Sequence, residues 1–246
     1  RIKERIREER KPQAPGELPP QGAQDVAIVV REEEPYVHHP ATEQDIRAVL
    51  ERLPKGACDK LTGIELCLGA FEQNEVAKQN DDHDGQKDPY IGRLGFEVFP
   101  GVYCGSAMGL YQQEAKRIWV YAYVYDPQHT LRAQIDLLCK CRALVTLVHE
   151  MAHHHDRTMR VARGRWRMDK RDRDENFAEQ LEQAWTAQCV VPYVEQTYPR
   201  QVARLLDWVR EHTGACVTLG MIMGEPYRNK EGEARYHEPV MLFRMM

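Results

Sequence analysis

The clearest pattern in the chain covers residues 137–152, where apolar positions recur every three or four residues between polar ones. This spacing predicts a helix with one broad buried stripe, formed by Leu137, Leu138, Cys141, Leu144, Val145, Val148, Met151 and Ala152. Similar spacing predicts a helix that begins near Glu175 and another over residues 193–213. The second half of the chain is therefore predicted to be mainly helical.

The first half contains shorter apolar runs that are typical of strands. Residues 26–30 and 64–68 are predicted strands, and residues 42–53 between them have the pattern of an amphipathic helix. Runs at 109–111 and 118–125, separated by polar residues, predict a β-hairpin directly before the long helix. Strands followed by helices indicate an α+β fold.

The two ends of the chain differ from the middle. Residues 1–24 carry mixed charge and then several prolines and glycines, which predicts an arm or linker. Residues 25–220 are expected to form one folded domain, since a chain of 246 residues suffices for one good core. Residues 221–246 are expected to be an irregular tail packed on or near that domain.

Composition narrows the class of protein. A formal net charge of −4 argues against a dedicated nucleic-acid binder. Seven cysteines cannot all pair within the chain, and no signal sequence or membrane-spanning run is present, so reduced thiols and a cytoplasmic location without membrane contact are expected. Residues 157–173, from Arg157 to Arg173, are strongly basic. They are either a solvated segment or a contact for nucleic acid or another acidic partner, with Trp166 available for stacking.

The long predicted helix carries the sequence His149-Glu150-Met151-Ala152-His153, an HExxH motif. Two histidines four residues apart project from the same side of a helix, about one turn from each other, as two ligands of one small cation must. In such sites zinc keeps one position for water, and the intervening glutamate, here Glu150, takes the proton as that water attacks a carbonyl. The motif predicts a zinc-dependent hydrolase with one Zn²⁺ per chain.

Catalytic zinc usually has three protein ligands, and Glu175 is the predicted third. It lies at the edge of the apolar stripe of its helix, as His149 does on its own helix. Alternatives for this ligand are Glu179, Asp169, Asp172 and Asp174. Glu179, one turn after Glu175, is also predicted to accept a hydrogen bond from a ligand histidine and so fix its tautomer.

With HExxH at 149–153 and Glu-x-Phe-Ala-Glu at 175–179, the chain resembles the gluzincins, zinc metallopeptidases with a glutamate as third ligand. The second motif is similar to that of the anthrax lethal factor group, and the resemblance covers roughly residues 140–185. It implies that His149, His153 and Glu175 bind zinc and that Glu150 is the general base. It also implies a zincin-like domain, in which a small mixed or antiparallel sheet packs on the HExxH helix, further helices follow, and an extended peptide pairs with the edge strand. The 25–220 domain would then be catalytic.

The related families differ at informative positions. A metzincin would have glycine and histidine where this chain has Asp156 and Met159. Lethal-factor-type sites place a transition-state-stabilising tyrosine shortly before the third ligand, but no tyrosine occurs between Asp156 and Glu175. Possible replacements are Tyr193, Tyr198, Tyr236 and His237.

The resulting prediction is a metallopeptidase that hydrolyses peptide bonds of a protein or peptide substrate. One alternative is a regulatory or nucleic-acid-binding protein that uses residues 157–173 and keeps zinc for stability. Another is a peptidase-like domain that becomes active only with a partner. Glu150→Gln separates these alternatives, because an enzyme would keep its metal and lose turnover.

Overall fold

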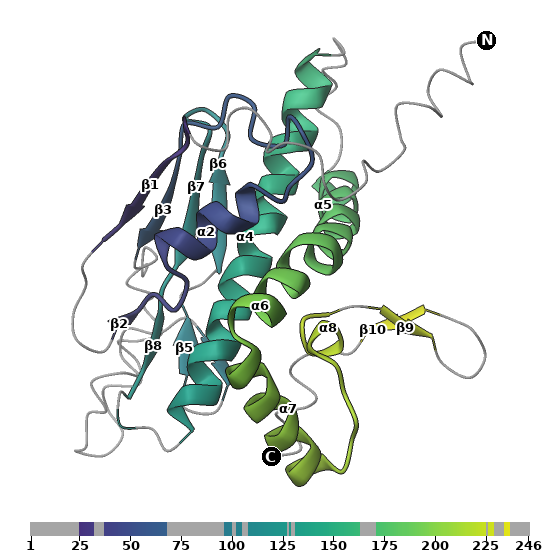
Figure 1. The fold of residues 1–246 in the computed structure, drawn as a ribbon. Coiled ribbons are helices and arrows are strands. Elements are labelled where there is room, and N and C mark those ends of the chain that lie inside the picture. The colour runs from purple at the N-terminus through teal and green to yellow at the C-terminus, as the bar shows by residue number, and fades with distance from the viewer. Residues whose placement is uncertain are drawn as a thin grey trace, which may run out of the picture.

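The computed structural model describes residues 25–31, 37–67, 96–99, 102–104, 108–126, 128, 131–162, 171–224, 226–228 and 234–236. Within them the fold is a mixture of sheets and helices, as the sequence predicts (Figure 1). The arm predicted for residues 1–24 lies outside the described residues.

The first sheet has four strands in the order β1-β3-β7-β6. Its strands are β1 (Ala27–Val30), β3 (Gly63–Cys67), β7 (Arg117–Tyr121) and β6 (Gly109–Gln112). The pairs β1–β3 and β3–β7 are parallel, whereas β6 and β7 form the predicted antiparallel hairpin. Strand β6 is therefore an edge of this sheet, within the part of the chain that the structure describes.

A second, antiparallel sheet has the order β2-β8-β5-β4. It contains β2 (Val37–His38), β8 (Tyr123–Tyr125), β5 (Val102–Cys104) and β4 (Phe96–Phe99). The run at 118–125 is thus not one strand, because it divides at Ala122 between β7 and β8. The Ala122 N–H donates to the carbonyl of Cys67, the last residue of β3, and the chain then enters the other sheet. The chain breaks here because β7 pairs with β3 whereas β8 pairs with β5. The apolar pattern of the sequence does not reveal these pairing partners.

Two helices cover one face of the first sheet. Helix α2 (Glu43–Leu50) begins at a capping box, in which Thr42 and Asp45 exchange hydrogen bonds. Helix α4 (Arg132–Ala162) is the long predicted helix, and it lies between the first sheet and α5 (Figure 1). All eight residues of its predicted apolar stripe are buried. Burial of this stripe against the sheet fixes which side of α4 remains for other contacts.

The helices after α4 extend to residue 222. They are α5 (Arg171–Trp185), the π-helix η4 (Thr186–Val190), α6 (Val191–Thr197), α7 (Pro199–Thr213) and α8 (Leu219–Ile222). The single helix predicted over 193–213 is divided, because Pro199, which has no N–H, starts a new helix. Helix α7 ends at Gly214, which has a left-handed φ of 69°.

The C-terminal tail is more regular than predicted. A boundary at residue 220 would cut α8, in which Leu219 and Ile222 are buried in the core. Beyond α8, β9 (Pro226–Arg228) pairs antiparallel with β10 (Ala234–Tyr236). Among the described helices, none combines the length and the apolar character needed to cross a bilayer.

Candidate metal centre

Three predicted ligands meet between α4 and α5. The Nε2 atoms of His149 and His153 are 3.1 Å apart. The Oε2 atom of Glu175 is 3.6 Å from Nε2 of His149 and 3.5 Å from Nε2 of His153. A tetrahedral zinc ion with bonds of 2.0–2.1 Å separates its ligand atoms by about 3.3 Å. The triangle of nitrogen and oxygen atoms therefore has the size that one zinc ion requires.

The cluster is partly exposed to solvent. The side chains of His149, His153 and Glu175 are 23%, 15% and 57% exposed, respectively. Among the described residues, only these three form a group of histidine, cysteine and carboxylate side chains suited to a metal ion. A zinc ion bound by these three donor atoms would keep a fourth coordination position accessible to water.

The carboxylate that orients His149 belongs to Glu182, not to Glu179 as the sequence analysis predicted. Nδ1 of His149 lies 2.7 Å from Oε2 of Glu182, whereas Glu179 is exposed. Since an ionised carboxylate only accepts, Nδ1 of His149 carries the hydrogen, and Nε2 keeps its lone pair for a metal. Glu182 follows Glu175 by seven residues on α5, a spacing that puts both on one face of the helix.

The same carboxylates affect the protonation of His149. Burial opposes the charged imidazolium, but the hydrogen bond to Glu182 and the charges of Glu150, Glu182 and Glu175 outweigh it and raise the pKa of His149. In the charged form Nε2 of His149 carries a proton, and zinc can bind Nε2 only after that proton has left.

Glu150 is buried, with 9% of its surface exposed. Burial raises the pKa of its carboxyl to about 7, although the charge of His149 and a backbone N–H of Tyr111 partly oppose the shift. A carboxylate with a pKa near neutrality is well matched to accept a proton from water at physiological pH. Glu150 thus has the environment of a general base.

Edge strand β6 lies directly against this part of α4. A Cβ atom on Gly109 would stand 2.5 Å from Cγ2 of Thr146 and 3.3 Å from Cγ of Glu150. Only glycine allows the backbone this close, and two residues later the Tyr111 N–H donates to the carboxylate of Glu150. The sequence analysis did not identify Gly109 or Tyr111 as part of the site. The one local signal was a glycine at the start of a predicted strand.

Residues 153–155 are three consecutive histidines, and the last two, His154 and His155, are not part of the triangle. His154 is fully buried and contacts the Tyr111 hydroxyl and the Asp59 carbonyl. The ring of His155 lies edge-on to that of Trp185, with 5.7 Å between centroids. Helix α4 continues past Asp156 to Ala162.

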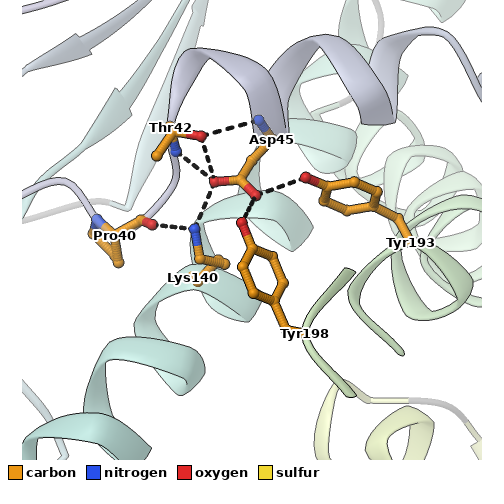
Figure 2. A network of polar contacts seen from close by, with 6 residues as sticks. All are labelled: Pro40, Thr42, Asp45, Lys140, Tyr193 and Tyr198. Atoms are coloured by element: carbon orange, nitrogen blue, oxygen red, sulfur yellow. Dashed lines mark hydrogen bonds and ion pairs between the residues drawn. The ribbon is translucent and has the colours of Figure 1, made fainter. Parts of the chain in front are cut away.

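The structure directs two of the tyrosines proposed for transition-state stabilisation, Tyr193 and Tyr198, to a buried carboxylate and not to the cluster. The hydroxyls of Tyr193 and Tyr198 donate to Oδ1 of the buried Asp45, at 2.8 and 2.5 Å (Figure 2). Lys140 donates to Oδ2 of the same carboxylate. These hydroxyls hold a buried charge because an unpaired carboxylate inside the protein is very costly. Tyr236 is in β10, and His237 lies outside the described residues.

The basic segment is described only in part. Residues 157–162 form the end of α4 and residues 171–173 begin α5, whereas 163–170 lie outside the described part of the chain. Asp172 and Asp174 are in α5, with side chains that the structure does not describe, and Asp169 is outside it.

No family model, curated protein or solved structure matches this chain. The case for a metal centre therefore rests on the geometry of the site itself.

Proposed function

We propose that the protein is a zinc-dependent metallopeptidase of the gluzincin type, with a zincin-like fold. One observation carries the proposal: the ligand atoms of His149, His153 and Glu175 form a triangle with edges of 3.1–3.6 Å beside the buried carboxylate of Glu150. That triangle fits one tetrahedral zinc ion, whose remaining position is open to water.

Each residue would then have a defined role. Bound zinc would acidify a water molecule and polarise the scissile carbonyl. His149, His153 and Glu175 would hold the ion, and Glu182 would keep His149 in the tautomer that presents Nε2. Glu150 would accept the proton of the water and pass it to the leaving amine.

The edge strand supports a peptide as substrate. Strand β6 adjoins Glu150 through Gly109 and Tyr111, and within the described residues no other strand pairs with its outer edge. Leu110 on this strand is 46% exposed. An extended peptide that adds to such an edge gains main-chain hydrogen bonds independently of its side chains. Its scissile carbonyl would then lie near the general base.

Metal analysis and hydrolysis together test the proposal. We expect the purified protein to bind one zinc ion, and His149→Ala and Glu175→Ala to reduce zinc affinity strongly. Glu150→Gln should retain zinc and lose hydrolysis of a mixed peptide library by a factor of at least about 100. Stoichiometric, undiminished zinc binding by Glu175→Ala would contradict the ligand set.

The same experiment addresses the regulatory alternative. If Glu150→Gln behaves as the wild type in every assay while His149→Ala loses zinc and unfolds, the metal is structural. The partial exposure of the cluster favours catalysis, because structural zinc sites have all four positions filled by protein.

A further inference from the structure

We propose that His154 is a positioning residue for the general base: through Tyr111 it holds edge strand β6 where the Tyr111 N–H bonds the Glu150 carboxylate. This inference rests on the proposed function for the catalytic role of Glu150. The arrangement itself is independent of catalysis. It also assigns a role to His154, the second of the three consecutive histidines, which is not part of the ligand triangle.

The hydrogen bonds of His154 define its tautomer. Nε2 lies 2.9 Å from the carbonyl oxygen of Asp59, and Nδ1 lies 3.0 Å from the hydroxyl of Tyr111. Because a carbonyl only accepts, Nε2 carries the hydrogen, and Nδ1 must accept from the Tyr111 hydroxyl. Both nitrogens of this fully buried ring therefore have partners. The ring lies edge-on to that of Tyr111, with centroids 5.3 Å apart.

Tyr111 connects two points of α4 that are one turn apart. Its hydroxyl contacts His154, and its backbone N–H donates to the carboxylate of Glu150, four residues earlier. Gly109 packs against Thr146, another turn earlier on the same helix. Strand β6 is thus attached along three successive turns of α4, and the His154–Tyr111 bond is its attachment farthest along the helix.

An edge strand needs such attachments. In the described structure β6 pairs with β7 on one side only, so its position depends also on the contacts that it makes with α4. If the Tyr111 side chain were released, its N–H would no longer be held on Glu150, and the strand would shift relative to the metal ligands. A displacement of about 1 Å in an active site can reduce the rate by about 100-fold.

Two variants remove the bond from opposite ends. Tyr111→Phe deletes the hydroxyl and keeps the ring. His154→Gln keeps an N–H that can reach the Asp59 carbonyl, but offers no acceptor at the position of Nδ1. Tyr125→Phe is the matched control, because it removes the hydroxyl of a different tyrosine, which is buried and bonded to Asp136.

The measurements are zinc stoichiometry, amide hydrogen exchange of residues 108–112, and kcat and KM for a cleaved peptide. We expect both variants to keep one zinc ion and to exchange the Tyr111 amide about 10-fold faster, with kcat reduced by about 10-fold or more and KM changed less. The double variant should be no worse than either single one, since each removes the same bond. Tyr125→Phe should match the wild type in all three measurements.

The inference would be overturned if the Tyr111 amide exchanged hydrogen at the wild-type rate in both single variants. It would also be overturned if this amide exchanged faster but kcat stayed unchanged. If the wild type cleaves no peptide at all, the proposed function fails. The exchange data then still show whether His154 and Tyr111 hold β6 against Glu150, so the two failures are distinguishable.

Discussion

Nδ1 of His149 is 2.7 Å from Oε2 of Glu182, and this contact joins the HExxH helix to the helix that carries the third ligand. The contact does two things at once. It leaves Nε2 of His149 facing His153 and Glu175, and it makes the imidazole a stronger base. Helix α5 thus carries both the proposed ligand Glu175 and the carboxylate that orients His149.

Replacing Glu182 should weaken zinc binding without removing a ligand. We expect Glu182→Gln to reduce zinc affinity by about 10-fold, because an amide holds the His149 tautomer less strongly than a carboxylate does. Competition titration with a chromophoric chelator measures the change. The exposed Glu179 is a matched control on the same helix, and Glu179→Gln should bind zinc as the wild type does. Equal losses in both variants would mean that net charge, and not this hydrogen bond, matters.

Zinc binding should also depend on pH through His149. The carboxylates near His149 raise its pKa, so the proton that competes with zinc remains bound at a higher pH than on an ordinary histidine. When the pH is lowered, zinc affinity should therefore begin to fall at a pH higher than about 6.5, which is the ordinary pKa of histidine. In Glu182→Gln the fall should begin at lower pH, since the main group that raises the pKa is gone. Affinities measured from pH 5 to 8 test this, and identical profiles for the two proteins would contradict it.

The predicted site residues that the structure brings together are those whose relation is local. His149, Glu150 and His153 share one helix, so their spacing fixes their geometry once the apolar stripe is seen to be buried. Glu175 is on a second helix, and its phase relative to that helix's stripe indicated it as the candidate that the structure places beside the two histidines. The α+β class likewise followed from strand and helix patterns that each involve neighbouring residues.

The residues that were missed depend on how distant elements pack. Glu179 and Glu182 lie less than one turn apart on α5. The angle at which α5 packs on α4 therefore determines which of the two side chains reaches His149. Gly109 and Tyr111 come from a strand whose register against α4 no local pattern encodes. The sequence predicted the hairpin but could not show which of its residues would meet Glu150.

The close approach of β6 to α4 makes Gly109 sensitive to any side chain. In Gly109→Ala the new methyl group would be 2.5 Å from Cγ2 of Thr146 and 3.0 Å from the carbonyl oxygen of Trp119, so the strand must move. We expect a loss of about 1–3 kcal/mol in the free energy of unfolding, together with reduced hydrolysis. Urea denaturation and peptide cleavage measure the two effects.

A second substitution gives the control for this prediction. Thr146→Ser removes Cγ2, so it should recover part of the stability lost in Gly109→Ala, while the contact with the Trp119 carbonyl remains. Thr146→Ser alone should cost little, because it deletes only one methyl group. If the double variant is no more stable than Gly109→Ala, the clash with Thr146 is not what limits the strand.

The buried Asp45 should make the fold sensitive to acid. Burial alone would raise its pKa, but hydrogen bonds from Lys140, Tyr198, Thr42 and Tyr193 outweigh burial and hold the pKa below its ordinary value. A carboxyl with a lowered pKa in the folded state stabilises the fold above its ordinary pKa of about 4. That stability is lost as the pH falls through the folded value.

Asp45→Asn tests this directly. It leaves the Lys140 ammonium, whose side chain is only 11% exposed, without its charge partner, and should reduce the free energy of unfolding near neutral pH by about 3–5 kcal/mol. As the pH falls from about 4 toward the lower pKa of folded Asp45, the gap between the variant and the wild type should narrow, because the unfolded wild type takes up a proton on Asp45 before the folded state does. Tyr198→Phe removes one hydrogen bond to the same carboxylate and should cost less, about 1.5–3 kcal/mol. Urea unfolding at several pH values distinguishes these expectations, and a loss for Asp45→Asn that stays constant from pH 7 to 3 would show that the charge of Asp45 contributes nothing.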